Sequence, residues 1–163
     1  MIQISIHKSM KNYTTDNLDL EILEILTQNS KVSYAEIAKK LIVSPGTIHV
    51  RLKKMENAGV IKGSVLKVDY RKLGYDLTAF IGVYLKSSSD YQHALEELKN
   101  INEVVEAHFT TGAYSIYIKL VARNTDHMHE ILTKKIQKIG DIQRTETMLS
   151  LEESIHRNVR LIN

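Results

Sequence analysis

Two closely spaced helix starts constrain the fold of this chain more than any other feature. Ser33-Tyr-Ala-Glu36 is a capping box, in which the serine accepts from the third helical amide and the glutamate reaches back. Ser44 is a second capping residue, and the single proline, Pro45, follows it where a missing N–H costs nothing. Gly59 offers a left-handed stop. The spacing predicts a short helix, a tight turn and a longer helix.

A further helix is expected ahead of this pair. Asp16 and Asn17 are good caps, and the residues that follow place apolar side chains on one helical face. The expected core-facing residues are Leu18, Ile22, Ile25 and Leu26 in this helix, and Tyr34, Ile37, Ala38 and Leu41 in the next. Three helices in this arrangement predict a helix-turn-helix domain.

The apolar period changes to two beyond Gly59, which is typical of strands. A strand at 61–69 and a hinge segment at 70–76 are expected first. The expected elements after the hinge are strands at 78–86, 104–111, 115–122 and 143–151, a helix at 91–100 opened by Ser89 and Asp90, and a helix at 126–139 capped by Thr125. The order β-α-β-β-α-β is that of a ferredoxin-like sandwich, so the predicted fold class is α+β.

These elements divide the chain into five predicted parts. They are an N-terminal extension at 1–12, the helix-turn-helix domain (winged-helix-like) at 13–63, a linker strand and hinge at 64–76, a ligand-binding and oligomerisation domain at 77–153, and a C-terminal tail at 154–163. No apolar run approaches the ~18 residues of a membrane span. The absence of cysteine excludes disulfides and thiolate metal sites and fits a reducing cytoplasm.

Charge separates the two halves of the chain. Residues 31–72 hold ten bases against three acids, a net +7, whereas residues 76–163 hold ten bases against twelve acids. The first stretch is therefore suited to a polyanion, and the second is not.

The helix that starts at Pro45 has one core face and one outer face. Ile48, Leu52 and Met55 fall together on a helical wheel, so the opposite side is free to enter a DNA groove. Thr47 and His49 are suited to base edges and Val50 to a thymine methyl, with Arg51 at the margin, whereas the lysines suit phosphates. The predicted DNA-contacting set is Ser33, Tyr34, Lys39, Lys40, Ser44, Gly46, Thr47, His49, Val50, Arg51, Lys53 and Lys54.

Three runs of sequence resemble a known family. Val43-Ser-Pro-Gly-Thr-Ile-His-Val-Arg51, Lys54-Met-Glu-Asn-Ala-Gly-Val-Ile61 and Leu73-Gly-Tyr-Asp76 are similar to the Lrp/AsnC feast-famine transcription regulators, and the similarity extends from about residue 12 to 151. The resemblance implies a winged DNA-binding domain, a C-terminal domain that binds an amino acid, and dimers that assemble further, commonly to octamers. A two-fold dimer in turn predicts a roughly palindromic site on double-stranded DNA.

The same resemblance locates an effector loop at residues 110–115. Ser115 stands where the leucine-responsive branch carries Asp, which favours the asparagine-responsive branch and makes asparagine the expected effector. The predicted ligand-binding set is Thr110, Thr111, Gly112, Ala113, Tyr114 and Ser115 of the loop with Gln143, Thr145 and Glu146 of the last strand. Without the resemblance, these loop residues describe only a hairpin turn.

The sequence gives little support for a metal site or for an enzyme active site. His127 and His129 point to different sides of a helix, so no metal site is expected. No phosphate loop, nucleophile elbow or dinucleotide fingerprint occurs, and we expect neither an enzyme nor a cofactor. The sequence predicts a transcription regulator controlled by an amino acid. An amino-acid-binding module that acts on a protein partner instead of DNA is the alternative.

Overall fold

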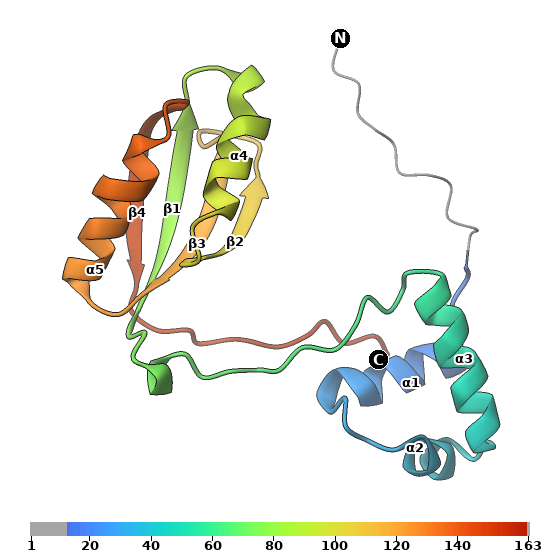
Figure 1. Cartoon of the computed structure of the whole chain (residues 1–163). Helices are drawn as coiled ribbons and strands as arrows, with labels where there is room; N and C mark the ends of the chain where they lie inside the picture. The colour runs from blue at the N-terminus through green and yellow to red at the C-terminus, as the bar shows by residue number, and fades with distance from the viewer. Residues whose placement is uncertain (1–12, 163) are drawn as a thin grey trace. The chain divides into compact units, whose positions relative to one another are not determined.

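The computed structural model describes residues 13–162, and the predicted extension at 1–12 lies outside them. The chain forms two compact units (Figure 1). Among the described residues, the first comprises 13–66 together with 155–162, and the second runs from Lys67 to Ser154. Within residues 13–162, no helix is long and apolar enough to cross a membrane.

Three helices build the first unit: α1 (Asn17–Gln28), α2 (Tyr34–Leu41) and α3 (Pro45–Asn57). Each begins at a predicted cap, namely Asp16, Ser33 and Ser44, whose side chains accept hydrogen bonds from the first turns. Ile22, Ile37, Ile48 and Met55 are fully buried between the helices. The predicted helix-turn-helix is thus confirmed, but Tyr34 does not face inward as expected, because its side chain is 43% exposed.

The C-terminal residues bind along α1 through two hydrogen bonds. Asn158 Nδ2 donates to the carbonyl oxygen of Thr27 at 2.9 Å, and the Leu161 N–H donates to Glu24 Oε2 at 2.9 Å.

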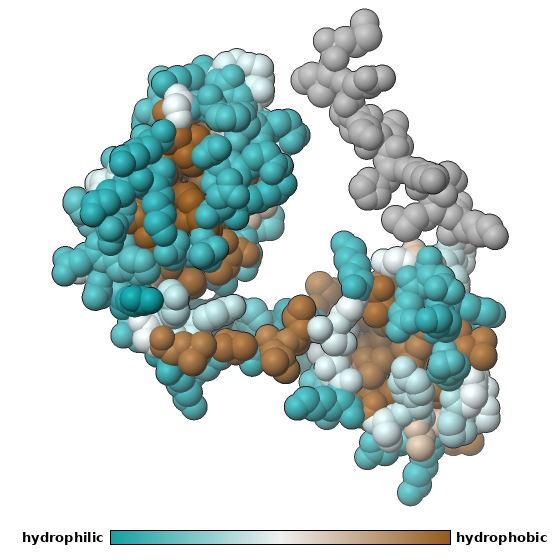
Figure 2. All heavy atoms as spheres, in the orientation of Figure 1, coloured by the Kyte–Doolittle hydropathy of each residue, from teal (hydrophilic) through white to brown (hydrophobic). Residues whose placement is uncertain are grey.

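The strand expected at 61–69 is absent from the single chain, where these residues have no regular secondary structure. Val65 and Leu66 are 94% and 81% exposed, and Figure 2 shows apolar atoms exposed along the connecting segments. The alternating pattern is genuine, but a strand needs a neighbour to pair its backbone groups, and this chain supplies none here.

The second unit is a four-stranded antiparallel sheet covered on one face by helices (Figure 1). Its strands are β1 (Leu77–Leu85), β2 (Val104–Phe109), β3 (Ile116–Ala122) and β4 (Ile142–Ser150), in the order β2-β3-β1-β4. The helices are α4 (Tyr91–Lys99) and α5 (Thr125–Glu130), and α5 continues as a π-helical turn (Ile131–Lys135) and a 3₁₀ turn (Ile136–Lys138). This is the predicted ferredoxin-like β-α-β-β-α-β arrangement.

Alternating residues of the central strands face the helices and form the core of this unit. Ile81 and Val83 of β1 and Ile118 of β3 are fully buried together with Leu98 of α4 and Ile131 beyond α5. The opposite face of the sheet has no covering layer among the described residues. It carries Phe80 stacked on Tyr117, with ring centroids 5.9 Å apart.

The helix α4 begins at Tyr91 with Asp90 at its N-cap position, as predicted, but Asp90 makes no side-chain capping bond to it. Ser87 caps the 3₁₀ turn (Ser88–Asp90) that leads into α4 and forms a capping box with Asp90.

The cap of α5 was predicted one residue too late. Asn124, not Thr125, caps α5 and accepts a hydrogen bond from the His127 N–H at 2.8 Å. Because Thr125 is itself a good cap, sequence alone favoured the wrong neighbour.

Candidate DNA-binding surface and effector site

The start of α3 is capped by a side-chain hydrogen bond. Ser44 Oγ accepts a hydrogen bond from the Thr47 N–H at 3.1 Å, and the two hydroxyls lie 2.9 Å apart. Pro45 takes the first helical position, as predicted. Thr47 is thereby held one turn into the helix, with its hydroxyl on the Ser44 side.

The two faces of α3 separate as the wheel predicts. Ile48, Leu52 and Met55 are at most 4% exposed. Val50 is 52% exposed, which leaves its methyl groups open to a partner. The other predicted groove and phosphate residues that the structure places at the surface are Gly46, His49, Lys53 and Lys54.

The shorter helix α2 contributes to the same neighbourhood. The ring of Tyr34 lies beside His49 of α3, with centroids 6.0 Å apart. Lys39 and Lys40 are exposed in its last turn. Ser33 is engaged in its capping box, where its N–H and hydroxyl both donate to Glu36 Oε2.

The turn between α2 and α3 contains a strained residue. Ile42 adopts the left-handed conformation, with φ 56° and ψ 46°, and its side chain is 93% exposed. A β-branched residue is disfavoured there, and left-handed residues commonly end helices. The turn therefore holds Ile42 in a left-handed conformation that isoleucine disfavours.

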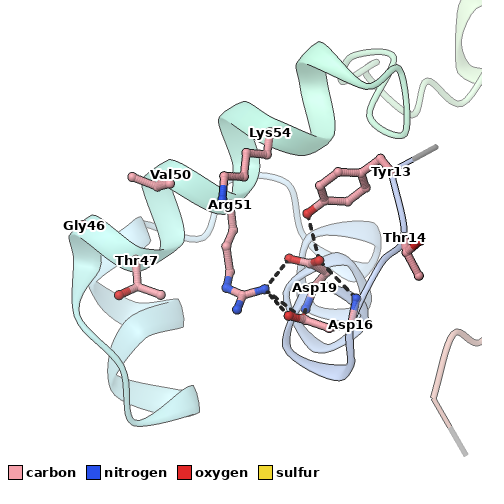
Figure 3. Close-up of a pocket in the computed structure, with 9 residues that line it drawn as sticks. All are labelled: Tyr13, Thr14, Asp16, Asp19, Gly46, Thr47, Val50, Arg51 and Lys54. Atoms are coloured by element: carbon pink, nitrogen blue, oxygen red, sulfur yellow. Dashed lines mark hydrogen bonds and ion pairs between the residues drawn. The ribbon is translucent and has the colours of Figure 1, made fainter. Parts of the chain in front are cut away.

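Arg51 differs from the other predicted DNA contacts. Its Nη1 donates to both carboxylate oxygens of Asp16, at 2.8 and 2.6 Å, and to Asp19 Oδ1 at 2.9 Å (Figure 3). The guanidinium therefore points toward the start of α1, not toward a groove. Sequence reasoning placed Arg51 at the margin of the outer face but did not find this pairing, because a helical wheel says nothing about the neighbouring helix.

The cluster around Arg51 extends to Tyr13, whose hydroxyl donates to Asp19 Oδ2 at 2.8 Å. Hydrogen bonding to Arg51 lowers the pKa of Asp16, while burial and the bond to Asp19 raise the pKa of Tyr13. A surface pocket of about 570 Å³ lies between this cluster and the outer face of α3. It is lined by Tyr13, Thr14, Asp16, Asp19, Gly46, Thr47, Val50, Arg51 and Lys54.

In the second unit, the predicted effector loop connects β2 to β3. Gly112 has a φ of 105°, which a glycine adopts without strain. The Thr110 hydroxyl donates to the Tyr114 carbonyl at 2.8 Å, and the Ser115 N–H donates to the Val83 carbonyl at 2.9 Å. The loop is thus closed on itself and tied to β1.

Tyr114 and Glu146, both predicted from sequence, meet on the open face of the sheet. The Tyr114 hydroxyl donates to Glu146 Oε2 at 2.9 Å, while Tyr84 and Arg144 donate to Oε1 at 3.0 and 2.6 Å. Hydrogen bonds from these donors, of which the one from Tyr114 has the largest effect, lower the pKa of Glu146. The hydrogen bond between Tyr114 and Glu146 also raises the pKa of Tyr114. A carboxylate held ionised is suited to an ammonium group.

The remaining residues of the predicted strand set lie elsewhere. Thr145 pairs with the buried Val83, so it faces the helices, whereas Glu146 pairs with Gly82 and faces the open side. Gln143 is exposed near the start of β4. Gly82, Tyr84 and Arg144 were not among the predicted site residues, because only strand register brings them beside Tyr114 and Glu146.

Each of the two units matches a known protein family. Residues 15–62 match a winged helix-turn-helix DNA-binding family, and residues 78–159 match the Lrp/AsnC ligand binding domain. The chain is 50% identical to the regulatory protein AsnC of Escherichia coli over 151 residues, covering 93% of this chain and 99% of that protein. It is 47% identical to the regulatory protein AsnC of Haemophilus influenzae over 148 residues, covering 91% and 99%.

Solved structures agree with this. The structure of E. coli AsnC superposes with a TM-score of 0.87 at 49% identity, covering 91% of this chain and 99% of that one. A transcriptional regulator of Neisseria meningitidis, solved as a complex with L-methionine, shares the fold at 21% identity, with a TM-score of 0.84 over 88% of this chain and 94% of its own. The chain therefore belongs to the Lrp/AsnC family of transcription regulators, with an N-terminal helix-turn-helix for DNA and a C-terminal ligand-binding domain.

Proposed function

We propose that this regulator binds a specific, roughly palindromic DNA site and that asparagine controls this binding or the assembly of the protein. The observation that carries the DNA half of the proposal is the outer face of α3. There Thr47, His49 and Val50 stand beside Lys53 and Lys54, opposite a fully apolar core face.

The roles of these residues follow from their chemistry and position. Thr47, His49 and Val50 lie in the first turns of α3, the part of a recognition helix that meets base edges, with Gly46 leaving room for close approach. Lys53 and Lys54, with Lys39 and Lys40 of α2, contact phosphates and position the protein without reading sequence. The backbone amides at the starts of α2 and α3, near Ser33, Tyr34 and Ser44, add further phosphate contacts.

The effector half rests on the cluster around Glu146. In this proposal an amino acid places its ammonium group toward the Glu146 carboxylate and its own carboxylate at the loop, where Gly112 and Ala113 leave backbone amides accessible. The side-chain amide of asparagine is uncharged, so it suits the hydroxyls of Thr111 and Ser115 better than an acid or a base would. Thr145 has no part in this proposed site, because it pairs with Val83 and faces the helices.

A homodimer, assembling further to an octamer, is the proposed working form. The open face of the sheet carries the aromatic pair Phe80 and Tyr117, and Met148 beside Phe80 is 42% exposed. Leu66 and Leu151, outside the sheet, are 81% and 96% exposed. A second copy that covers such apolar surface explains why these residues are tolerated. A two-fold dimer then presents two α3 helices to half-sites about 34 Å apart.

Two measurements test the proposal. The first is binding to a duplex that the chain selects from a randomised pool, titrated with salt. We expect sequence preference together with a steep decrease in affinity as salt rises. A flat slope without preference contradicts DNA recognition and favours the module that acts on a protein partner.

The second measurement is calorimetry of the full chain against the twenty amino acids, followed by sedimentation with the best ligand. We expect asparagine to bind most tightly and to shift the oligomer distribution or the affinity for the selected duplex, because a ligand acts through its different affinity for two states. Tight binding of leucine without binding of asparagine overturns the assignment of the effector.

A further inference from the structure

Asp19 is the single fully buried charged side chain in the described part of the chain, at 1% exposure. A buried carboxylate is costly unless it is paired and hydrogen-bonded. Its oxygens accept from Arg51 Nη1 at 2.9 Å, from the Tyr13 hydroxyl at 2.8 Å and from the Asp16 N–H at 3.2 Å. Oδ1 of Asp19 therefore depends on the presence of Arg51 from α3 at this place, whereas Oδ2 accepts from Tyr13 and Asp16.

The hydrogen bonds between Arg51 and the two carboxylates depend on direction, whereas the apolar packing between α1 and α3 does not. Ile22 of α1 and Ile48 of α3 pack in the same core, and such contacts permit small rotations and translations of one helix against another. The Arg51 guanidinium instead bonds to carboxylate oxygens of Asp16 and Asp19 at 2.6 and 2.9 Å (Figure 3). Hydrogen bonds of this kind require a defined direction as well as a distance, so they restrict rotation of α3 more than apolar contacts do.

The charge of the cluster argues against a direct contact with DNA. One guanidinium faces two carboxylates, so the charge of Arg51 is neutralised within the cluster and is not free to pair with a phosphate. Its value to a DNA-binding helix therefore lies in geometry and not in attraction.

We propose that Arg51 is a positioning residue which sets the rotation of α3, and thereby the sequence discrimination of the protein, without touching DNA. Asp16 and Asp19 hold its guanidinium, and Tyr13 in turn bonds to Asp19. This inference rests on the DNA binding proposed above. A small rotation of α3 moves Thr47, His49 and Val50 relative to base edges, while the flexible lysines still reach phosphates. Loss of the cluster therefore lowers specific affinity more than non-specific affinity.

The test uses Asp19→Asn and Tyr13→Phe in the full chain. The probes are a duplex selected by the wild-type chain from a randomised pool and a scrambled duplex of the same composition. Electrostatics alone predicts that removing the negative charge of Asp19 strengthens binding to both. We expect instead that the ratio of selected to scrambled affinity falls about tenfold in Asp19→Asn, the discrimination that one bidentate base contact supplies, and falls less in Tyr13→Phe, which removes one hydroxyl.

Glu21→Gln is the matched control, because it removes a negative charge from the same helix. Its side chain has no hydrogen bond or ion pair to α3 among residues 13–162. The control should leave the ratio unchanged. Melting followed by circular dichroism verifies that each variant is folded, and if Asp19→Asn is unfolded at the assay temperature, Tyr13→Phe decides.

The outcomes separate this inference from the proposed function. If the wild-type chain selects no duplex, the proposed function fails. If it selects one and both cluster variants keep the wild-type ratio, positioning by Arg51 is wrong. Arg51→Ala adds a readout, because removing a cation that neutralises a phosphate reduces the salt slope on scrambled DNA by about 0.9, whereas removing a positioning residue leaves that slope unchanged.

Discussion

The ring of Tyr114 lies directly against the backbone of Gly82, so closely that a Cβ atom on Gly82 would stand 2.3 Å from Tyr114 Cδ1. No side chain fits at this point of β1. Because Gly82 has no side chain, Tyr114 can lie across the sheet and place its hydroxyl 2.9 Å from Glu146 Oε2. A strand glycine therefore determines the geometry of the proposed effector site.

Gly82→Ala should displace the Tyr114 ring and break its bond to Glu146. We expect asparagine binding to weaken about tenfold, the effect of one charge-assisted hydrogen bond. The pKa of Tyr114 should also fall toward its ordinary value, because that bond is the largest cause of its rise. Calorimetry and ultraviolet titration measure the two effects.

Gly140→Ala is the control for this variant, since nothing lies within 4 Å of the atom that it adds. It should bind asparagine as the wild-type chain does. Unchanged binding in Gly82→Ala would show that the ring position has no part in the site.

The outer face of α3 should divide into residues that read sequence and residues that supply affinity. Thr47→Ala with His49→Ala should erode preference for the selected duplex, whereas Lys53→Ala with Lys54→Ala should weaken all duplexes about equally and reduce the salt slope by about 0.9 for each phosphate that is no longer neutralised. Competitive gel shifts at several salt concentrations measure both. Thr47→Ser keeps the hydroxyl that lies 2.9 Å from Ser44 Oγ and should retain preference. Identical behaviour of the two pairs would refute the division.

Ile42→Gly should stabilise the helical unit. Left-handed backbone costs an ordinary residue about 1–2 kcal/mol, a cost that glycine avoids. Glycine also loses more conformational entropy on folding, which offsets about 0.5–1 kcal/mol of this gain. The side chain is 93% exposed, so little packing is lost. We expect a net gain of about 0.5–1 kcal/mol, or a few degrees in Tm, in thermal unfolding. Ile42→Ala keeps the Cβ atom and should gain nothing; equal stabilisation by alanine would assign the effect to removal of an exposed apolar group.

The sequence predicted what depends on near neighbours along the chain. Helical period found the buried face of α3, and capping chemistry found Ser33 and Ser44, because both act within one or two turns. The sequence did not predict that Asp19 pairs with Arg51, because helix packing brings these two residues together. It also did not predict that the Tyr114 ring packs on Gly82, because that contact depends on strand register. The strand expected at 61–69 failed for a related reason, since its pairing requires backbone that this chain does not supply there.

His93 should stabilise the second unit only while it is protonated. Its ring is hydrogen-bonded to Asp141, and that bond, followed by the charges of Asp141, Glu97 and Asp90, raises the pKa of His93 above its ordinary value of about 6.5. A raised pKa in the folded state means that the stabilisation is fully present below the unfolded pKa and is lost as pH rises through the folded one.

We therefore expect His93→Gln to be less stable than the wild-type chain at about pH 5 and equally stable at about pH 9. Urea unfolding at both values measures the difference, and the titration of the ring by NMR gives the pKa directly. His129→Gln is the control, because His129 is a second histidine in this unit and has no ion pair or side-chain hydrogen bond among the described residues. A penalty for His93→Gln that persists unchanged at pH 9 would mean that the ring acts through packing, not through its charge.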